Sequence, residues 1–154
     1  MSIEDKLAEL GLTLPKPAAP VAAYVPVVIS GGMAYVSGQV SMKDGQLIKG
    51  RLGETMTPEE GIAAAQACGL MIVAQLKAAL GGDLSRIEKI VKLGAFVSST
   101  ADFVDQPKIA NGASELMVAL FGEAGRHARS AVGVPVLPLG VAVEIDAIVA
   151  IRAD

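Results

Sequence analysis

The sequence predicts a β-sheet with two long helices packed on one of its faces, and three observations support this. The expected elements follow the order helix, two strands, helix, strand, helix, two strands. Both longer helical segments carry apolar residues at helical spacing, which is typical of helices that cover a sheet. In the last strand, alternate residues form one continuous apolar face: Val141, Val143, Ile145, Ala147, Val149 and Ile151.

The first 23 residues are predicted to form a short helix followed by a proline-rich strap. Ser2 and Asp5 indicate the start of the helix, and Gly11 indicates its end. Residues 14–20 contain three prolines and are expected to be extended, because proline lacks a donor and restricts its predecessor. We interpret residues 1–154 as a single domain.

A β-hairpin is predicted next, with strands over residues 25–29 and 33–40. The Gly31-Gly32 pair between two β-favouring runs is a hairpin turn signal. Residues 43–46 are expected to form a second turn.

The two long helices are recognised by their start and stop signals. Thr57 caps the first, Glu60 completes a capping box, and the Gly81-Gly82 pair ends it. A strand over residues 90–98 follows, and Thr100 and Asp102 are alternative caps of the second helix.

Two strands over residues 128–134 and 141–152 complete the chain. On the last one, the face opposite the apolar residues carries Glu144 and Asp146 among small and apolar side chains. Such a face is either solvated or a subunit contact that contains a polar site, and periodicity alone does not decide between them.

Composition excludes several classes of protein. Apolar residues make up 52% of the 154 residues, charged residues 19% and aromatic residues 3%, with a net charge of -3. A disordered chain would be more polar, and a nucleic-acid partner is unlikely without a basic or aromatic surface. The densest apolar run, residues 67–74, is short for a membrane span. With a single cysteine and no signal segment, we expect a cytoplasmic protein.

Metal and nucleophilic chemistry find little support in the sequence. One histidine, His127, and one cysteine, Cys68, do not make a metal-ligand cluster. Cys68 is expected to be a buried small hydrophobe, and His127 a structural or exposed residue.

The C-terminal part of the chain resembles the Rid/YjgF family of reactive intermediate deaminases. The resemblance rests on Arg-Ser-Ala-Val-Gly-Val at 129–134, Leu137-Pro138, and Val-Glu-Ile-Asp-Ala at 143–147. Upstream, Tyr24 and Ser-Gly-Gln at 37–39 are similar to the family's motifs. The N-terminal helix and strap resemble those of a longer branch of this family.

The resemblance implies an α+β, chorismate-mutase-like fold: a mixed sheet with two helices on one face, joined into a homotrimer through the other. It also implies the hydrolysis of enamines and imines such as 2-aminoacrylate to a 2-keto acid and ammonia, in clefts between subunits, without a metal or other cofactor.

The resemblance further implies a set of site residues. Arg129 would bind the substrate carboxylate through two parallel hydrogen bonds, and Glu144 would position and deprotonate the attacking water. The backbone N–H of Ala131, which stands where many members have cysteine, would add a donor. The cleft would be lined by Tyr24, Ser37 and Gly38.

Two alternatives to an enzyme of this kind stay open. The first is a trimer that binds a small carboxylate, such as a keto acid, without turnover. The second is an endoribonuclease, which is disfavoured because the chain has one histidine and a net charge of -3.

Overall fold

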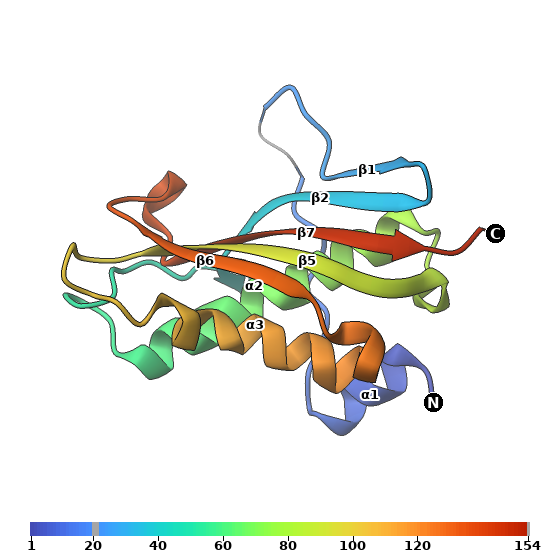
Figure 1. Ribbon diagram of the computed structural model, residues 1–154, viewed down its shortest axis with the longest axis horizontal. Helices are drawn as coiled ribbons and strands as arrows, with labels where there is room; N and C mark the ends of the chain where they lie inside the picture. The colour runs from blue at the N-terminus through green and yellow to red at the C-terminus, as the bar shows by residue number, and fades with distance from the viewer. Residues whose placement is uncertain (20–21, 154) are drawn as a thin grey trace.

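The computed structural model describes residues 1–19 and 22–153, and it contains a five-stranded sheet with two long helices on one face (Figure 1). The helices and strands of the described residues are α1 Ile3–Glu9, β1 Val27–Ser30, β2 Met33–Val40, β3 Met42–Lys43, β4 Gln46–Leu47, α2 Pro58–Ala79, β5 Ile87–Ser98, α3 Gln106–Phe121, β6 Ala128–Val134 and β7 Val143–Ile151. Short 3-10 helices lie at Leu84–Arg86, Gly122–Gly125 and Pro138–Gly140.

The sheet has the strand order β1-β2-β7-β5-β6. Strands β5 and β6 run parallel, with α3 as the connection between them, and the other neighbouring pairs are antiparallel. This arrangement is a mixed sheet, so the expected α+β fold class is confirmed. Strands β3 and β4 form a separate small hairpin beside the sheet.

Local signals account for most of the helix ends. Ser2 accepts a hydrogen bond from the backbone of Asp5, whose side chain accepts one in return, so α1 starts with a capping box. The same reciprocal pair of bonds joins Thr57 and Glu60 at the start of α2. At the β1–β2 turn, Gly31 and Gly32 both have positive φ, which favours glycine.

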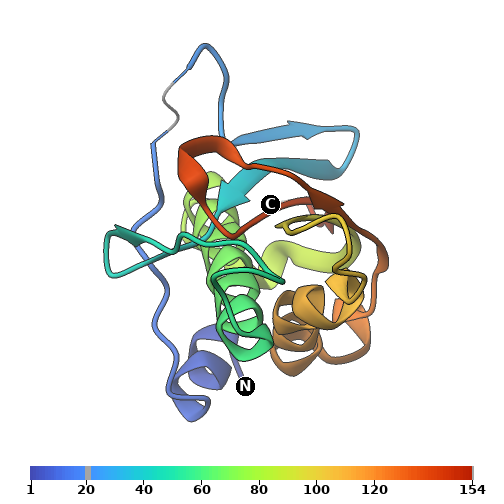
Figure 2. The same ribbon diagram turned by 90° about the vertical axis from the view of Figure 1, so that its left-hand side faces the viewer.

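The core lies between the sheet and the two long helices. Val143, Ile145 and Val149 of β7 are fully buried beneath α2 and α3, as the alternation predicts. Figure 2 shows the helices together on one side of the sheet. Cys68 of α2 is also fully buried, and burial raises the pKa of its thiol, so it behaves as a small core residue.

We call the other side of the sheet the open face. Its side chains include Tyr35, Val28 and Val132, each between 45% and 49% exposed, and the described residues contain no helix over them. Glu144, Asp146 and Ile148 of β7 are half-buried there. Exposed apolar side chains of this number on one face are typical of an interaction surface.

The predicted bounds of three strands were wrong. The first strand starts at Val27 and not at residue 25, and the last covers Val143–Ile151 and not 141–152. The middle strand begins at Ile87 and not at 90, because β5 continues to pair with β7 as far as Ile151, past two irregularities in register.

The predicted cap of the second long helix was also wrong. Asp105, and neither Thr100 nor Asp102, is the N-cap of α3. The Thr100 hydroxyl donates to the Asp102 carboxylate at 2.6 Å, so the two side chains satisfy each other before the helix begins.

The expectation that the apolar run of this region is too short to span a membrane was wrong for helix α2. It has 22 residues and contains an 18-residue window of mean hydropathy 1.5, which is long and apolar enough to cross a membrane. The reason is that further apolar residues lie beyond Gln66 and Gln75, which bound residues 67–74 within the helix. Most of this window, 61%, is buried inside the protein, as in a core helix.

Candidate functional site

Arg129 projects from β6 toward α3 and is held there by two side chains of that helix. Its Nη1 donates to Asn111 Oδ1 at 2.8 Å and to Ser114 Oγ at 3.1 Å. Both hydrogens of Nη1 are therefore engaged, since that nitrogen carries two. Nε and Nη2 make no hydrogen bond or ion pair with another described residue.

A second pair of hydrogen bonds sets the direction of the Ser114 hydroxyl. His127 Nδ1 lies 2.6 Å from the carbonyl oxygen of Gly125, which can only accept, so Nδ1 carries a proton. In the neutral imidazole Nε2 is then an acceptor, and it lies 2.8 Å from Ser114 Oγ. The hydroxyl donates to Nε2 and leaves its oxygen lone pairs to Arg129.

These residues line a shallow depression of about 570 Å³ on the α3 side of β6. Arg126, which is exposed, lies at its edge and pairs with Glu123 at 3.1 Å. Glu115 of α3 also lines the depression. Within it, the unengaged Nε and Nη2 of Arg129 are the donors that suit a small anion.

Glu144 lies on the open face, where its side chain extends over the backbone of β2 at Gly38. A Cβ atom at Gly38 would collide with its carboxylate, so glycine at this position makes room for the acid. A register irregularity between Val36 and Gln39 brings Gly38 under Glu144. Burial, together with the nearby Asp146, raises the pKa of the Glu144 carboxyl above its ordinary range.

Ser37 directly precedes the glycine beneath Glu144, and Tyr24 lies on the segment before β1. The Ser37 hydroxyl donates to the carbonyl oxygen of Val25 at 2.8 Å, which ties β2 to the segment that carries Tyr24. The Tyr24 side chain is exposed. Ser37 and Gly38 are thus brought to Glu144 by the strand pairing, with Tyr24 on the adjoining segment.

Arg129 and Glu144 lie on opposite faces of the sheet. Arg129 pairs with Leu93, which is buried beneath the helices, and directly paired residues share a face. Glu144 pairs with Phe96, and because side chains alternate along β5, Phe96 points to the face opposite that of Leu93. Ala131 shares the Arg129 face and packs against the core. The predicted residues therefore form two groups, and one chain by itself does not bring them together.

Sequence reasoning missed Asn111 and Ser114, and it read His127 only as structural or exposed. Asn111 and Ser114 are three residues apart, a spacing that places side chains on one side of a helix. That spacing indicates a shared helix face, but only the packing of β6 beside α3 shows that this face meets Arg129. Among the described residues, no group of three or more acidic, histidine or cysteine side chains is placed to hold a metal ion.

Comparison with known proteins agrees with this fold. A profile of the family described as "YjgF/chorismate mutase-like, putative endoribonuclease" matches residues 4–149. Protein TCP17 of Trypanosoma cruzi is 51% identical over 149 residues, which are 96% of this chain and 92% of that protein.

Solved structures extend the comparison. Atu1372 of Agrobacterium tumefaciens, described as a protein of unknown function, superposes with a TM-score of 0.91 and is 47% identical, over 98% of this chain and 92% of that one. E. coli TdcF, solved with bound serine, has a TM-score of 0.60 and is 26% identical, over 92% and 96% of the two chains.

Proposed function

The chain belongs to the YjgF/chorismate mutase-like family, and on this basis we propose that it hydrolyses small carboxylate-bearing enamines and imines to 2-keto acids and ammonia. The substrate class is that of 2-aminoacrylate and its imine tautomer.

The observation that carries the proposal is the way in which Arg129 is held. Asn111 and Ser114 engage only Nη1, so the edge formed by Nε and Nη2 is left to a ligand. That edge matches the two oxygens of a carboxylate, which it binds with two parallel charge-assisted hydrogen bonds. The bound serine of TdcF, a small molecule with a carboxylate, supports this choice of ligand.

Glu144 supplies the second requirement of the reaction, a base for water. Its carboxylate takes a proton as the water oxygen bonds to the iminium carbon. The proton then passes to the nitrogen. As the carbon–nitrogen bond breaks and ammonia leaves, the Glu144 carboxylate takes the hydroxyl proton and the carbonyl forms, and the released ammonia carries that proton away as ammonium. A raised pKa suits this role, because a stronger base accepts the proton more readily.

The proposed site lies between two chains. Because Arg129 and Glu144 are on opposite faces of one sheet, a substrate that meets both must lie between the Arg129 side of one subunit and the open face of another. The exposed apolar side chains of the open face support association through that surface, and we propose a homotrimer.

A coupled assay tests the proposal. A pyridoxal-phosphate dehydratase generates 2-aminoacrylate from serine, and keto-acid formation is followed with and without this protein. We expect the wild-type chain to accelerate the release, and Arg129→Lys to lose most of the acceleration because lysine lacks the planar fork. No acceleration by the wild-type chain would contradict the proposal.

Binding without turnover is the second candidate, and the TdcF complex with serine favours testing it. Saturable binding of a keto acid that Arg129→Lys weakens, combined with no acceleration of imine hydrolysis, would identify the protein as a carboxylate-binding trimer. Calorimetric titration with 2-oxobutanoate measures this directly.

A further inference from the structure

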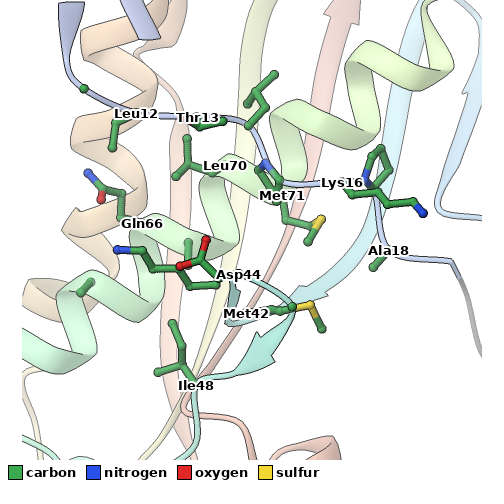
Figure 3. Close-up of a pocket in the computed structure, with 18 residues that line it drawn as sticks. Leu12, Thr13, Lys16, Ala18, Met42, Asp44, Ile48, Gln66, Leu70 and Met71 are labelled. Atoms are coloured by element: carbon green, nitrogen blue, oxygen red, sulfur yellow. The ribbon is translucent and has the colours of Figure 1, made fainter. Parts of the chain in front are cut away.

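A separate cavity lies between the N-terminal strap, the β3–β4 hairpin and helix α2 (Figure 3). We use the term strap for residues 11–19. The cavity has a volume of about 750 Å³, within the range of about 300–1,000 Å³ that is usual for small-molecule sites. None of the predicted site residues lines it. It is therefore a second place at which the protein can hold a ligand.

Buried polar contacts fix the strap that forms one wall of the cavity. The side chain of Gln75 in α2 is 3% exposed, and its Nε2 donates to the carbonyl oxygen of Ala18 at 2.8 Å. The same nitrogen donates to Gln39 Oε1 at 3.2 Å. Buried polar groups of this kind are costly unless they are paired, so Gln75 holds the strap at a defined place.

The preceding helix anchors the other end of the strap. Lys77 of α2 pairs with Glu4 of α1 at 3.1 Å, and Lys6 donates to the carbonyl oxygen of Leu120 at 3.1 Å. Leu7 is buried in the core. With both ends attached to the body of the protein, the strap spans the cavity and does not fill it.

The wall of the cavity is mainly apolar and adaptable. Leu12, Leu70 and Ile48 contribute aliphatic side chains, and Met42 and Met71 add thioethers (Figure 3). Methionine fits ligands of varied shape and contacts aromatic rings favourably through its sulfur. No aromatic residue is among the described residues of the lining, so a ring in the ligand would be the partner of these sulfurs.

The charges at the rim favour an uncharged ligand. Lys43 and Asp44 are neighbours at the tip of the hairpin, and their charges sum to zero. The ammonium group of Lys16 points away from the other labelled side chains in Figure 3. Gln66, half-buried, makes no side-chain hydrogen bond to another described residue, so its amide can donate to or accept from a neutral polar group.

We propose that the cavity binds an uncharged, mainly apolar small molecule that carries an aromatic ring and one hydrogen-bonding group. The ring lies against Met42 and Met71, and the polar group meets the Gln66 carboxamide. This site does not depend on Arg129 or on the proposed hydrolysis.

Calorimetric titration with three molecules of equal length tests the ligand class. These are 4-phenylbutan-1-ol, 4-phenylbutyrate and 4-phenylbutylamine. We expect the alcohol to bind at least about tenfold more tightly than either ion, because an ion loses hydration in the cavity without gaining a paired charge. No binding of the alcohol, or equal binding of an ion both by the wild-type chain and by Arg129→Lys, which lacks the proposed carboxylate fork, would overturn the proposal.

Two variants of α2 locate the binding. Ala63→Phe places a ring at the cavity wall and is expected to abolish binding of the alcohol, whereas Ala78→Phe, at an exposed position outside the cavity, is its matched control. Thermal melts confirm that both variants fold. If Ala63→Phe binds the alcohol like the wild-type chain, the ligand is elsewhere and the proposal is wrong.

A third variant tests the polar contact. Gln66→Leu is expected to weaken binding of the alcohol by about tenfold, the loss of one hydrogen bond, and to leave butylbenzene binding unchanged. An equal loss for both molecules would show that the carboxamide does not recognise the polar group. Arg129→Lys should leave the affinities for the alcohol and for butylbenzene unchanged.

Discussion

The two sides of the sheet hold their functional charges in different ways. Arg129 is surrounded by neutral polar partners that fix one of its nitrogens and leave the other two unengaged. Glu144 is half-buried beside another acid, and its negative charge makes no ion pair with a described residue. One region therefore presents an orientated cation and the other a destabilised anion, and each lacks the counter-charge that the other carries.

This difference supports a two-chain site. A guanidinium with unengaged donors fits an anionic substrate, and a desolvated carboxylate is a better base than an exposed one. Separation on opposite faces also prevents the two charges from pairing with each other inside one chain. Variants that remove or loosen either half distinguish a two-chain site from a site within one chain.

The largest effect is expected from chains that lack one half of the site. Arg129→Ala and Glu144→Gln should each lower the rate of imine hydrolysis by roughly 10²–10⁴-fold, the usual contribution of a positioned acid or base. Trimers assembled from equal amounts of the two variants should recover about a quarter of the wild-type activity, because about one interface in four then combines an intact Arg129 with an intact Glu144.

Co-expression with two different affinity tags provides these mixed trimers, and the coupled assay measures them. Trimers of either variant alone are the control. Mixed trimers that remain as inactive as the single variants would place both residues in one chain's site, against the arrangement described here.

A smaller effect is expected from loosening Arg129 without removing it. Ser114→Ala removes one acceptor of Nη1, so the guanidinium is free to rotate, and KM should rise by about tenfold, in line with a hydrogen bond to a charged group. Because the Glu144 side is unchanged, kcat should stay close to that of the wild-type chain.

Ser114→Thr keeps the hydroxyl and is the matched control. It should restore KM to the wild-type value. If Ser114 only stabilised the helix, the hydroxyl of threonine would not be expected to restore KM. Steady-state kinetics of both variants decide the point, and a fall in kcat with unchanged KM would rule out positioning as the role of Ser114.

The smallest effect concerns the pH dependence of stability. Since the pKa of Glu144 is raised in the folded protein, the folded state holds this proton more tightly than the unfolded state does. The free energy of unfolding should therefore fall as pH rises through the range just above the ordinary value of 4.5. Glu144→Gln removes this half-buried charge and is therefore expected to raise Tm at about pH 8.

Thermal melts at two pH values check the direction in which stability changes with pH. At about pH 3.5, where the carboxyl is protonated in both states, the two proteins should melt together. Glu115→Gln, at an exposed position of α3, is the control. A Glu144→Gln variant less stable than the wild-type chain at about pH 8 would mean that the charge has a stabilising partner.

Features that depend on near neighbours could be predicted from the sequence. The capping boxes at Ser2 and Thr57 and the glycine turn at Gly31-Gly32 follow from residues a few positions apart. The alternation of β7 predicted which face is buried, since side chains of a strand point to the two faces in turn. The same alternation placed Glu144 on the opposite face.

Features that join distant residues depend on tertiary packing and could not be predicted from local patterns. Ser114 meets both His127 and Arg129 because α3 packs beside β6, and Gly38 lies under Glu144 because β2 pairs with β7. The cavity beneath the strap exists because Gln75 binds the backbone at Ala18, 57 residues away. Such contacts depend on how the elements pack around the core, and no local pattern in the sequence encodes that packing.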